Sequence, residues 1–402
     1  MKSNTLYVFC QLFYPELIST GQTVTELCEA LQKKGQNITV FCAQPTLIKT
    51  NKVNTELHYK GIQINRLKST RFSKLNFFGK LSNHISFSIS CFFKLWSLPK
   101  NATVLVFTNP PILPLIVRLV KTFKSIHYTV VLFDLYPQSL VAQGLLKKSS
   151  IVTKLYLKLI NSAYNNASHL VSIGRCMKHL VDSQLSNSQK SIYIPIWADT
   201  THIQNPKKQK DFKKEWDLEN SFIVGYSGNL ALFHPIETMI YAAEKMQDYK
   251  EIKFLFIGEG SKKKWAQAYC AKHNLTNCLF YPYVARDHLG DLLSIFDCGL
   301  VGLNEKNTGL SVPSKTMGLL SAGVPIIGCL SAKSEIGLIL NELQCGLTSE
   351  SSDINSLIEN ILFLFKNTQK RHELSKNALY AVNSKFNLDK ITLEYLQILS
   401  KS

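Results

Sequence analysis

One segment in the second half of the chain brings together residue types that bind phosphate. Residues 308–315 read TGLSVPSK, and residues 319–325 read LLSAGVP. Pro313 fixes a turn, and Ser314 is suited to cap the N-terminus of a following helix. Lys315 then adds a cation where the helix dipole is positive. The combination predicts a phosphate site at Pro313, Ser314 and Lys315, with Gly323 letting the end of that helix close against a sheet.

Two glycine-containing loops offer further contacts. Gly21 and Gln22 follow the first apolar run, and Gly228 and Asn229 follow a later one, each just before a helical pattern. Glycine lets a backbone N–H approach an oxygen of a phosphate or a sugar, and an asparagine amide both donates and accepts. Neither loop is a G-x-G-x-x-G or Walker pattern, and an ordinary turn between a strand and a helix is the alternative for both.

Asp134 is the acidic residue best suited to general-base chemistry. It follows the apolar run 128–133, which predicts a strand with Asp134 at its carboxyl end. We expect it to contact an acceptor hydroxyl or the sugar and to take a proton there. The alternative is that Asp134 caps the following turn.

The composition favours a partner that carries phosphates. The 402 residues contain 46 Lys and Arg against 28 Asp and Glu, a net charge of +18. Nucleic acid, an anionic membrane surface and phosphorylated substrates all suit such an excess, and lysines scattered over solvated surfaces are the alternative. No zinc-finger, RNP-type or basic-helix pattern is present, which argues against nucleic acid. The ten cysteines form no C-x-x-C pair, so we interpret them as small core residues in a reducing compartment.

Strand-like and helical patterns alternate along the chain, which predicts an α/β fold with parallel sheets covered on both faces. We expect two doubly wound, Rossmann-like domains that face each other across a cleft, at residues 1–200 and 201–385. A C-terminal helix in 386–402 is expected to pack back toward the first domain. Strands are expected at residues 6–12, 38–42, 62–67, 104–108, 128–133 and 170–173, and in the second domain at 222–226, 254–257, 278–281, 298–303 and 325–329.

Taken together, these segments resemble the retaining GT-B glycosyltransferases of family 4, and among them the branch of colanic-acid or fucosamine-type transferases. The resemblance rests first on PSK at 313–315 followed by SAGVP at 321–325. Further segments agree in order: FYPE at 13–16, TGQ at 20–22, TNPP at 108–111, DLYP at 134–137, GLL at 144–146, WAD at 197–199, YSGN at 226–229 and GEG at 258–260.

The resemblance implies an enzyme that transfers a sugar from a UDP- or GDP-linked donor, with no further cofactor, in the synthesis of a surface polysaccharide. It implies an N-terminal domain that binds the acceptor and a C-terminal domain that binds the nucleotide-sugar. The catalytic residues would be Asp134 and Lys315. The donor-binding residues would be Gly21, Gln22, Gly228, Asn229, Glu259, Pro313, Ser314, Lys315 and Glu335.

Two departures from the family pattern affect donor binding. Many members carry two Glu eight residues apart around the helix of the PSK segment, and the second recognises the donor's ribose. The aligned positions here are Leu310 and Gly318, so Glu335 is our candidate substitute, with a solvated Glu at a helix start as the alternative. The family's Arg and Lys in the loop after the first strand of the second domain are also absent, since residues 229–234 read NLALFH.

The resemblance also implies a mechanism. In a retaining transfer of this kind the acceptor hydroxyl attacks from the face that the diphosphate leaves, and the enzyme stabilises the charge on the leaving phosphate. Lys315, the helix N-terminus and backbone N–H groups near Gly228 would do this. The sequence contains no Asp-x-Asp pattern to hold a metal, so we expect metal independence.

Residues 66–100 interleave basic and aromatic side chains, which suits an anionic bilayer surface. Arg71, Lys74 and Lys80 are the candidate contacts there, and a lipid-linked glycan is the expected acceptor. The alternative is a core helix at residues 81–98 preceded by a basic loop. No apolar stretch is long enough to span a membrane and no signal-peptide pattern is present, so we expect a cytoplasmic monomer, with attachment to the inner face of the membrane left open.

Other functions stay in competition with sugar transfer. A sugar-nucleotide epimerase on the same architecture needs paired acid and base carboxylates, and a phosphorylase needs a lysine that holds its cofactor; the sequence shows neither pattern. A non-catalytic homologue that only binds a nucleotide-sugar is kept as an alternative because of Leu310 and Gly318.

Overall fold

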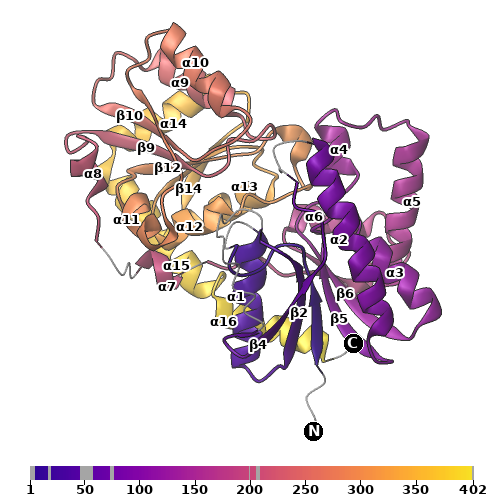
Figure 1. Ribbon diagram of the computed structural model, residues 1–402. Coiled ribbons are helices and arrows are strands. Elements are labelled where there is room, and N and C mark those ends of the chain that lie inside the picture. Colours follow the sequence, from indigo (N-terminus) through magenta and orange to yellow (C-terminus); the bar gives the residue numbers. More distant parts are fainter. Residues whose placement is uncertain are drawn as a thin grey trace. The chain divides into compact units, whose positions relative to one another are not determined.

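The computed structural model describes residues 5–16, 20–45, 58–72, 77–198, 200–204 and 209–400. The chain divides into two compact units (Figure 1). Unit 1 is Met1–Pro195 together with Leu388–Ser402, and unit 2 is Ile196–Asn387. The chain therefore leaves unit 1 after Pro195 and returns to it for its last helix. The boundaries expected at 200 and 385 lie a few residues from these positions.

The described strands of unit 1 form an eight-stranded sheet in the order β3-β4-β2-β1-β5-β6-β7-β8. Neighbours are parallel except β3 and β4, which pair antiparallel. The central strands are continuous apolar runs because helices cover both faces. The strands are β1 (Leu6–Phe9), β2 (Ile38–Ala43), β3 (His58–Tyr59), β4 (Ile62–Leu67), β5 (Ala102–Phe107), β6 (Ile126–Leu132), β7 (His169–Ser172) and β8 (Ser191–Tyr193).

The helices of unit 1 lie in two layers. The successive connections from β4 to β5, β6, β7 and β8 all run toward the same edge of the sheet. Because such crossovers are right-handed, their helices share one face of the sheet. These helices are α2 (Phe77–Ser97), α3 (Leu113–Phe123), the short α4 (Gln138–Ala142), α5 (Ile151–Asn165) and α6 (Arg175–Asp182). The connection from β1 to β2 runs the other way and places α1 (Thr20–Lys33) on the opposite face, where α16 (Leu388–Leu399) packs against it.

The described strands of unit 2 form a six-stranded parallel sheet in the order β11-β10-β9-β12-β13-β14. The strands are β9 (Phe222–Ser227), β10 (Ile252–Ile257), β11 (Cys278–Tyr281), β12 (Cys298–Gly302), β13 (Ile326–Cys329) and β14 (Gly346–Ser349). The helices are α7 (Thr200–Gln204), α8 (Phe212–Glu215), α9 (Ile236–Lys245), α10 (Lys263–Lys272), α11 (Leu289–Ser294), α12 (Lys315–Ser321), α13 (Glu335–Leu343), α14 (Ile354–Lys366) and α15 (Thr368–Ser384).

Each sheet has a point where the direction of winding reverses. In unit 2 the chain winds from β9 toward β10 and β11, and from β12 toward β13 and β14. The loops after β9 and β12 therefore diverge to opposite faces and leave a crevice at the carboxyl ends of these two strands. The corresponding point in unit 1 lies between β1 and β5. These crevices place the loops that carry Gly228, Lys315 and, in unit 1, Gly21.

The α/β class with two Rossmann-like units is confirmed. The expected strands all exist, with ends that differ by at most three residues, while β3, β8 and β14 were not anticipated. Nine of the ten cysteines are buried free thiols, which confirms these nine as core residues, while Cys176 is half-buried. Helix α12 contacts β12 and β13, and Gly323 follows its end with φ +66°, where a Cβ atom would meet Ser375 and Leu379 of α15.

Candidate functional site

The loops after β9 and β10 are hydrogen-bonded to each other at the carboxyl edge of the unit 2 sheet. The backbone N–H of Gly228 donates to the carbonyl of Ile257 over 2.9 Å, and that of Leu230 donates to Glu259 over 2.9 Å. This close pairing requires glycine at 258, where φ is +140° and a Cβ atom would lie 2.1 Å from the Gly228 carbonyl oxygen. The two loops therefore form one rigid rim.

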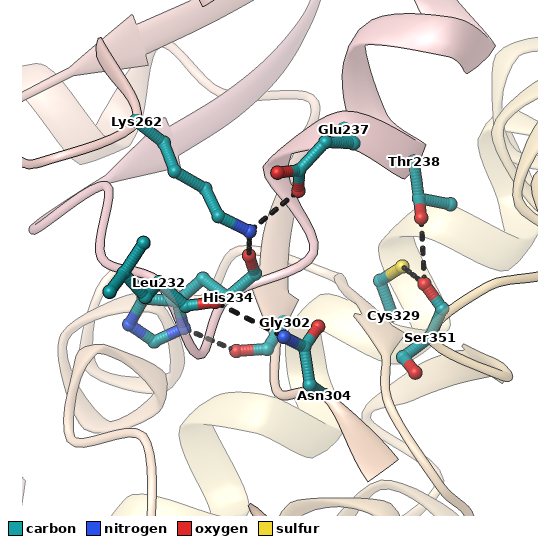
Figure 2. Close-up of polar contacts among 9 residues, drawn as sticks. All are labelled: Leu232, His234, Glu237, Thr238, Lys262, Gly302, Asn304, Cys329 and Ser351. Carbon is teal, nitrogen blue, oxygen red and sulfur yellow. Dashed lines mark hydrogen bonds and ion pairs between the residues drawn. The ribbon is translucent and has the colours of Figure 1, made fainter. Parts of the chain in front are cut away.

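Side chains fasten the β9–α9 loop from three directions (Figure 2). The Lys262 ammonium donates to the carbonyl of His234 over 2.8 Å and pairs with Glu237 over 2.6 Å. The Asn304 amide donates to the carbonyl of Leu232 over 3.2 Å. The imidazole of His234 lies 2.6 Å from the carbonyl oxygen of Gly302, at the end of β12. The loop is thus held in place before any ligand binds.

Lys315 is the first residue of α12, and its ammonium reaches the crevice between β9 and β12. It donates to the hydroxyl of Tyr226 and lies 3.6 Å from the centroid of that ring. The Tyr226 hydroxyl in turn donates to the carbonyl of Asn229 over 2.7 Å. A Cβ atom on Gly228 would lie 3.3 Å from the Lys315 nitrogen, so Gly228 borders the cation directly.

The electrostatics around Lys315 favour an anion. Burial lowers its pKa well below the usual range of a lysine. Among the described residues no carboxylate forms an ion pair with it. A cation that has lost solvation and lacks a carboxylate partner gains most from a bound anion, because the low local dielectric strengthens the attraction.

His234 is a buried, neutral imidazole beside this cation. Burial, with the nearby positive charges of Lys315 and Lys262, lowers its pKa to about 3 despite the opposing hydrogen bond to Gly302. A carbonyl only accepts, so Nδ1 carries the proton and Nε2 keeps its lone pair. Nε2 is therefore an acceptor, and no hydrogen bond among the described residues uses it.

Two details of the expected anion site are wrong, namely the side-chain cap by Ser314 and the availability of the Gly228 amide itself. Ser314 is exposed and has helical φ and ψ, and its side chain accepts no capping hydrogen bond. The turn is closed instead by the carbonyl of Pro313, which accepts from the amide and the hydroxyl of Thr316 over 3.2 and 2.8 Å. The Gly228 amide cannot face a diphosphate because it donates to Ile257. Asn229 is exposed, and no hydrogen bond among the described residues uses its amide N–H or its side chain.

The two acidic donor-site candidates lie in different surroundings. The Glu259 side chain is exposed and pairs with Lys263 over 2.7 Å. Glu335 is 2% exposed at the start of α13, so the alternative of a solvated helix-start Glu is wrong. Gly318, aligned with the family's ribose-binding Glu, faces Leu293 and Ile203, and a side chain there would meet apolar groups.

In unit 1, Asp134 follows β6 at the carboxyl edge of the sheet. The backbone amides of Phe133 and Asp134 donate to the hydroxyl of Thr108 at the end of β5, over 3.1 and 3.4 Å. Burial raises the pKa of the Asp134 carboxyl to about 6, and the charge of Lys80 opposes this. Backbone carbonyls accept the amides of the next turn, where Ser139 donates to Leu135, so Asp134 does not cap it.

Gly21 and Gln22 also lie in unit 1, at the start of α1. A Cβ atom on Gly21 would lie 2.2 Å from the carbonyl oxygen of Glu16, so glycine is needed there for close packing of the preceding loop. The Gln22 amide donates to Glu26 over 2.9 Å. Among the sequence candidates, the structure therefore groups Gly228, Asn229 and Lys315 around one crevice, and places Gly21, Gln22 and Asp134 on the other unit.

The basic candidates Arg71 and Lys80 are exposed in unit 1, and Lys74 lies outside the described residues. Residues 77–97 form the single helix α2, which is buried on one side only. No helix in the described part of the chain has both the length and the apolar content to cross a membrane. In the same residues, no three His, Cys, Asp or Glu side chains are grouped in a way that suits a metal ion.

The unit 2 crevice lies in a stretch, residues 207–379, that matches the family described as "Glycosyl transferases group 1". This stretch is a group 1 glycosyl transferase domain. The chain is 28% identical over 255 residues to the probable glycosyltransferase WbjE of Pseudomonas aeruginosa, covering 62% of each sequence. It is 25% identical over 193 residues to the putative colanic acid biosynthesis glycosyl transferase WcaI of Escherichia coli K12, covering 47% of each. The matches thus span about three fifths and about half of these relatives, and they confirm the expected resemblance.

Solved structures share the fold of this chain over nearly its whole length. Sucrose-phosphate synthase from Thermosynechococcus elongatus matches with a TM-score of 0.78 at 14% identity, covering 99% of this chain and 100% of the other. WaaG, a glycosyltransferase of lipopolysaccharide biosynthesis, and Anabaena HepE in complex with UDP-glucose each match at 0.74 and 12% identity, with the same coverage. These likenesses confirm the GT-B class and concern the fold alone.

Three further residues line or support the crevice, and their spacing in the sequence does not predict them as site residues. Tyr226 orients Lys315, His234 supplies the acceptor nitrogen, and Lys262 holds the loop between them. Lys262 follows GEG at 258–260, and His234 ends the NLALFH loop, so both stood beside a recognised segment. Nothing in their spacing shows that they point at Gly302 and at the loop carbonyls.

Proposed function

We propose that this chain transfers a sugar from a nucleoside-diphosphate donor to a hydroxyl group of a growing glycan in polysaccharide biosynthesis. The observation that carries the proposal is the Lys315 ammonium, which is desolvated, has no carboxylate partner among the described residues and lies at the switch point of a group 1 domain. WbjE, WcaI and WaaG are described as glycosyltransferases, and HepE binds UDP-glucose; these relatives support the same activity and donor class.

In the proposed reaction Lys315 stabilises the negative charge that builds up on the leaving diphosphate. Asn229 contributes its amide N–H and side chain to the diphosphate or the sugar, and the His234 nitrogen accepts a hydrogen bond from a hydroxyl group of the donor. The donor carries UDP or GDP, with Glu335 as the proposed residue near its ribose. The transfer retains the configuration of the sugar and needs no metal, because Lys315 supplies the positive charge.

The proposed acceptor is a lipid-linked glycan, and Asp134 is the proposed residue that receives the proton of its attacking hydroxyl. The carboxyl group is suited to that role because burial brings its pKa to about 6, close to neutral pH. In this arrangement unit 1 binds the acceptor and unit 2 binds the donor.

A radiolabelled-sugar assay tests the proposal. Wild-type protein and Lys315→Met are incubated with UDP- and GDP-linked hexoses and a synthetic polyprenyl-diphosphate sugar, with Mg²⁺ or with EDTA. We expect one donor to transfer label to the lipid phase equally well in both solutions, and Lys315→Met to lose activity by roughly 100-fold or more. Loss of all transfer in EDTA would overturn metal independence. Binding of a donor without any turnover would instead favour a non-catalytic homologue, and conversion of the free donor would favour an epimerase.

A further inference from the structure

The positive charge of the chain is concentrated in one stretch of unit 1. Between Glu56 and Asp182 there are 17 Lys and Arg residues, and Asp134 is the single acidic residue. The rest of the chain carries 29 Lys and Arg against 27 Asp and Glu. Almost the whole net charge of +18 therefore belongs to the stretch that contains α2, α3, α4 and α5, because this stretch has almost no acidic residues to balance its lysines and arginines.

The same stretch exposes apolar side chains to solvent. Of twenty large hydrophobic side chains that are exposed in the described part of the chain, twelve lie on α2, α3 and α5. On α2 they recur at intervals of three or four residues, which places them along one side of the helix. They are Phe78, Leu81, Ile85, Ile89, Phe93 and Trp96, opposite the buried Phe87, Cys91 and Leu95.

The neighbouring helices continue this surface. On α3 the exposed large hydrophobic residues are Leu119 and Phe123, and the ring centroids of Phe123 and Trp96 on α2 are 6.1 Å apart. On α5 they are Ile151, Val152, Leu155 and Leu159. The three helices cover the same face of the sheet, α3 contacts both of the others, and Figure 1 shows them side by side. We call the outward side of α2, α3 and α5 the α2–α3–α5 face.

Exposed lysines lie among and beside these apolar side chains. Lys80 is exposed in the first turn of α2, Lys154 and Lys158 are exposed on α5, and Lys147 and Lys148 are exposed just before it. The sequences of α2, α3 and α5 contain no Asp or Glu. Soluble monomers rarely expose a contiguous apolar patch of this extent unless it meets a partner. A matching partner therefore has an apolar interior and a negatively charged surface.

We infer that the α2–α3–α5 face docks on the surface of an anionic lipid bilayer. The apolar side chains enter the boundary between headgroups and acyl chains, where Phe and Trp are favoured, and the lysines meet the anionic headgroups. A second copy of the same face is disfavoured because it would bring the lysines of both copies together without any carboxylate between them. The inference deepens the proposed function by naming the surface where a lipid-linked acceptor would be met.

Vesicle flotation tests this inference without donor or acceptor, so its failure would leave the proposed transfer untouched. The probes are vesicles of phosphatidylcholine alone and of phosphatidylcholine mixed with phosphatidylglycerol. We expect the wild type to float with the mixed vesicles only, and less at high salt. The variants Ile89→Ser with Phe93→Ser, and Lys154→Glu with Lys158→Glu, are each expected to weaken binding about tenfold or more.

Matched controls change the same chemistry elsewhere. Leu393→Ser with Phe363→Ser alters exposed apolar residues of α16 and α14, and Lys33→Glu with Lys272→Glu reverses exposed charges on α1 and α10. We expect both controls to float like the wild type. If circular dichroism shows that Ile89→Ser with Phe93→Ser is misfolded, Lys154→Glu with Lys158→Glu still tests the inference, because both lysines are exposed.

Three results would overturn the inference. The first is a wild type that does not float with the anionic vesicles, and the second is equal loss of binding in the control pairs. In the third, the wild type binds no vesicles and sediments as a dimer, and Ile89→Ser with Phe93→Ser converts it to a monomer. The face would then be an interface between two copies.

Discussion

At the scale of single residues, the surroundings of His234 hold its imidazole in one protonation state. Its ordinary pKa is 6.5, and burial with two neighbouring lysines lowers it to about 3 in the folded chain. The unfolded chain therefore binds a proton at His234 at pH values where the folded chain does not. The stability that this difference confers is present above pH 6.5 and is lost as the pH falls toward 3.

His234→Asn removes this titration and keeps an amide donor for the Gly302 carbonyl. We expect the free energy of unfolding of the wild type to fall more steeply between pH 6.5 and 3 than that of the variant, by up to about 1.4 kcal/mol per pH unit. Urea unfolding across this range measures it. Parallel profiles for the two proteins would show that the imidazole is not kept neutral by the fold.

The pKa of the Asp134 carboxyl is raised, whereas that of His234 is lowered. Burial raises the pKa of its carboxyl to about 6, so the carboxylate becomes a proton acceptor only as the pH rises through that value. We expect kcat/KM to rise with an apparent pKa near 6, and Asp134→Asn to lose this limb and about 100-fold of activity. The same substitution should raise stability at pH 7, because it removes a buried charge.

Asp182→Asn is the matched control, since Asp182 pairs with Lys178 over 2.5 Å on α6 and has no proposed role. Normal turnover of Asp134→Asn across the pH range would remove Asp134 from the mechanism.

At the scale of elements, the rigid rim of the donor site depends on the two loops that follow β9 and β10. Gly258 has φ +140° and leaves no space for a Cβ atom next to the Gly228 carbonyl. We expect Gly258→Ala to destabilise the chain by about 2–4 kcal/mol, since strain and a backbone clash add. Gly35→Ala is the control, because Gly35 has φ +91° but open space around it, and about 1–2 kcal/mol is expected there. Equal losses in denaturant unfolding would contradict a tightly packed rim.

The order of the elements could be predicted from the sequence, because strand-like apolar runs and helical apolar periodicity alternate along the chain. The details of the donor site could not. The spacing predicted that Ser314 and Gly228 lie near an anion. In the fold, however, the Gly228 amide donates to the carbonyl of Ile257, and the carbonyl of Pro313 closes the first turn of α12 in place of the Ser314 side chain. Helix α2 shows the same limit: it has apolar residues on both sides, so its sequence leaves open which side meets solvent.

At the scale of the whole molecule, the last helix belongs to the first unit. Helix α16 packs on α1 and buries Ile391 and Tyr395, with Tyr395 2% exposed. We expect Tyr395→Ala to destabilise unit 1 by about 3–5 kcal/mol while unit 2 keeps its stability. Hydrogen exchange measures this: amides of β1 and β2 should lose protection, and those of β9 and β10 should not. Equal loss of protection in both units would contradict the division.

The claim that the donor diphosphate binds beside Lys315 is tested most directly by thermal shift. The melting temperatures of the wild type and of Lys315→Met are measured with UDP, GDP, ADP and their sugar conjugates, because a ligand that binds only the folded state raises the melting temperature. We predict that one nucleotide series stabilises the wild type and that the shift largely disappears in Lys315→Met, which without ligand melts no lower than the wild type. A shift of undiminished size in Lys315→Met, or none with any nucleotide, would contradict the account.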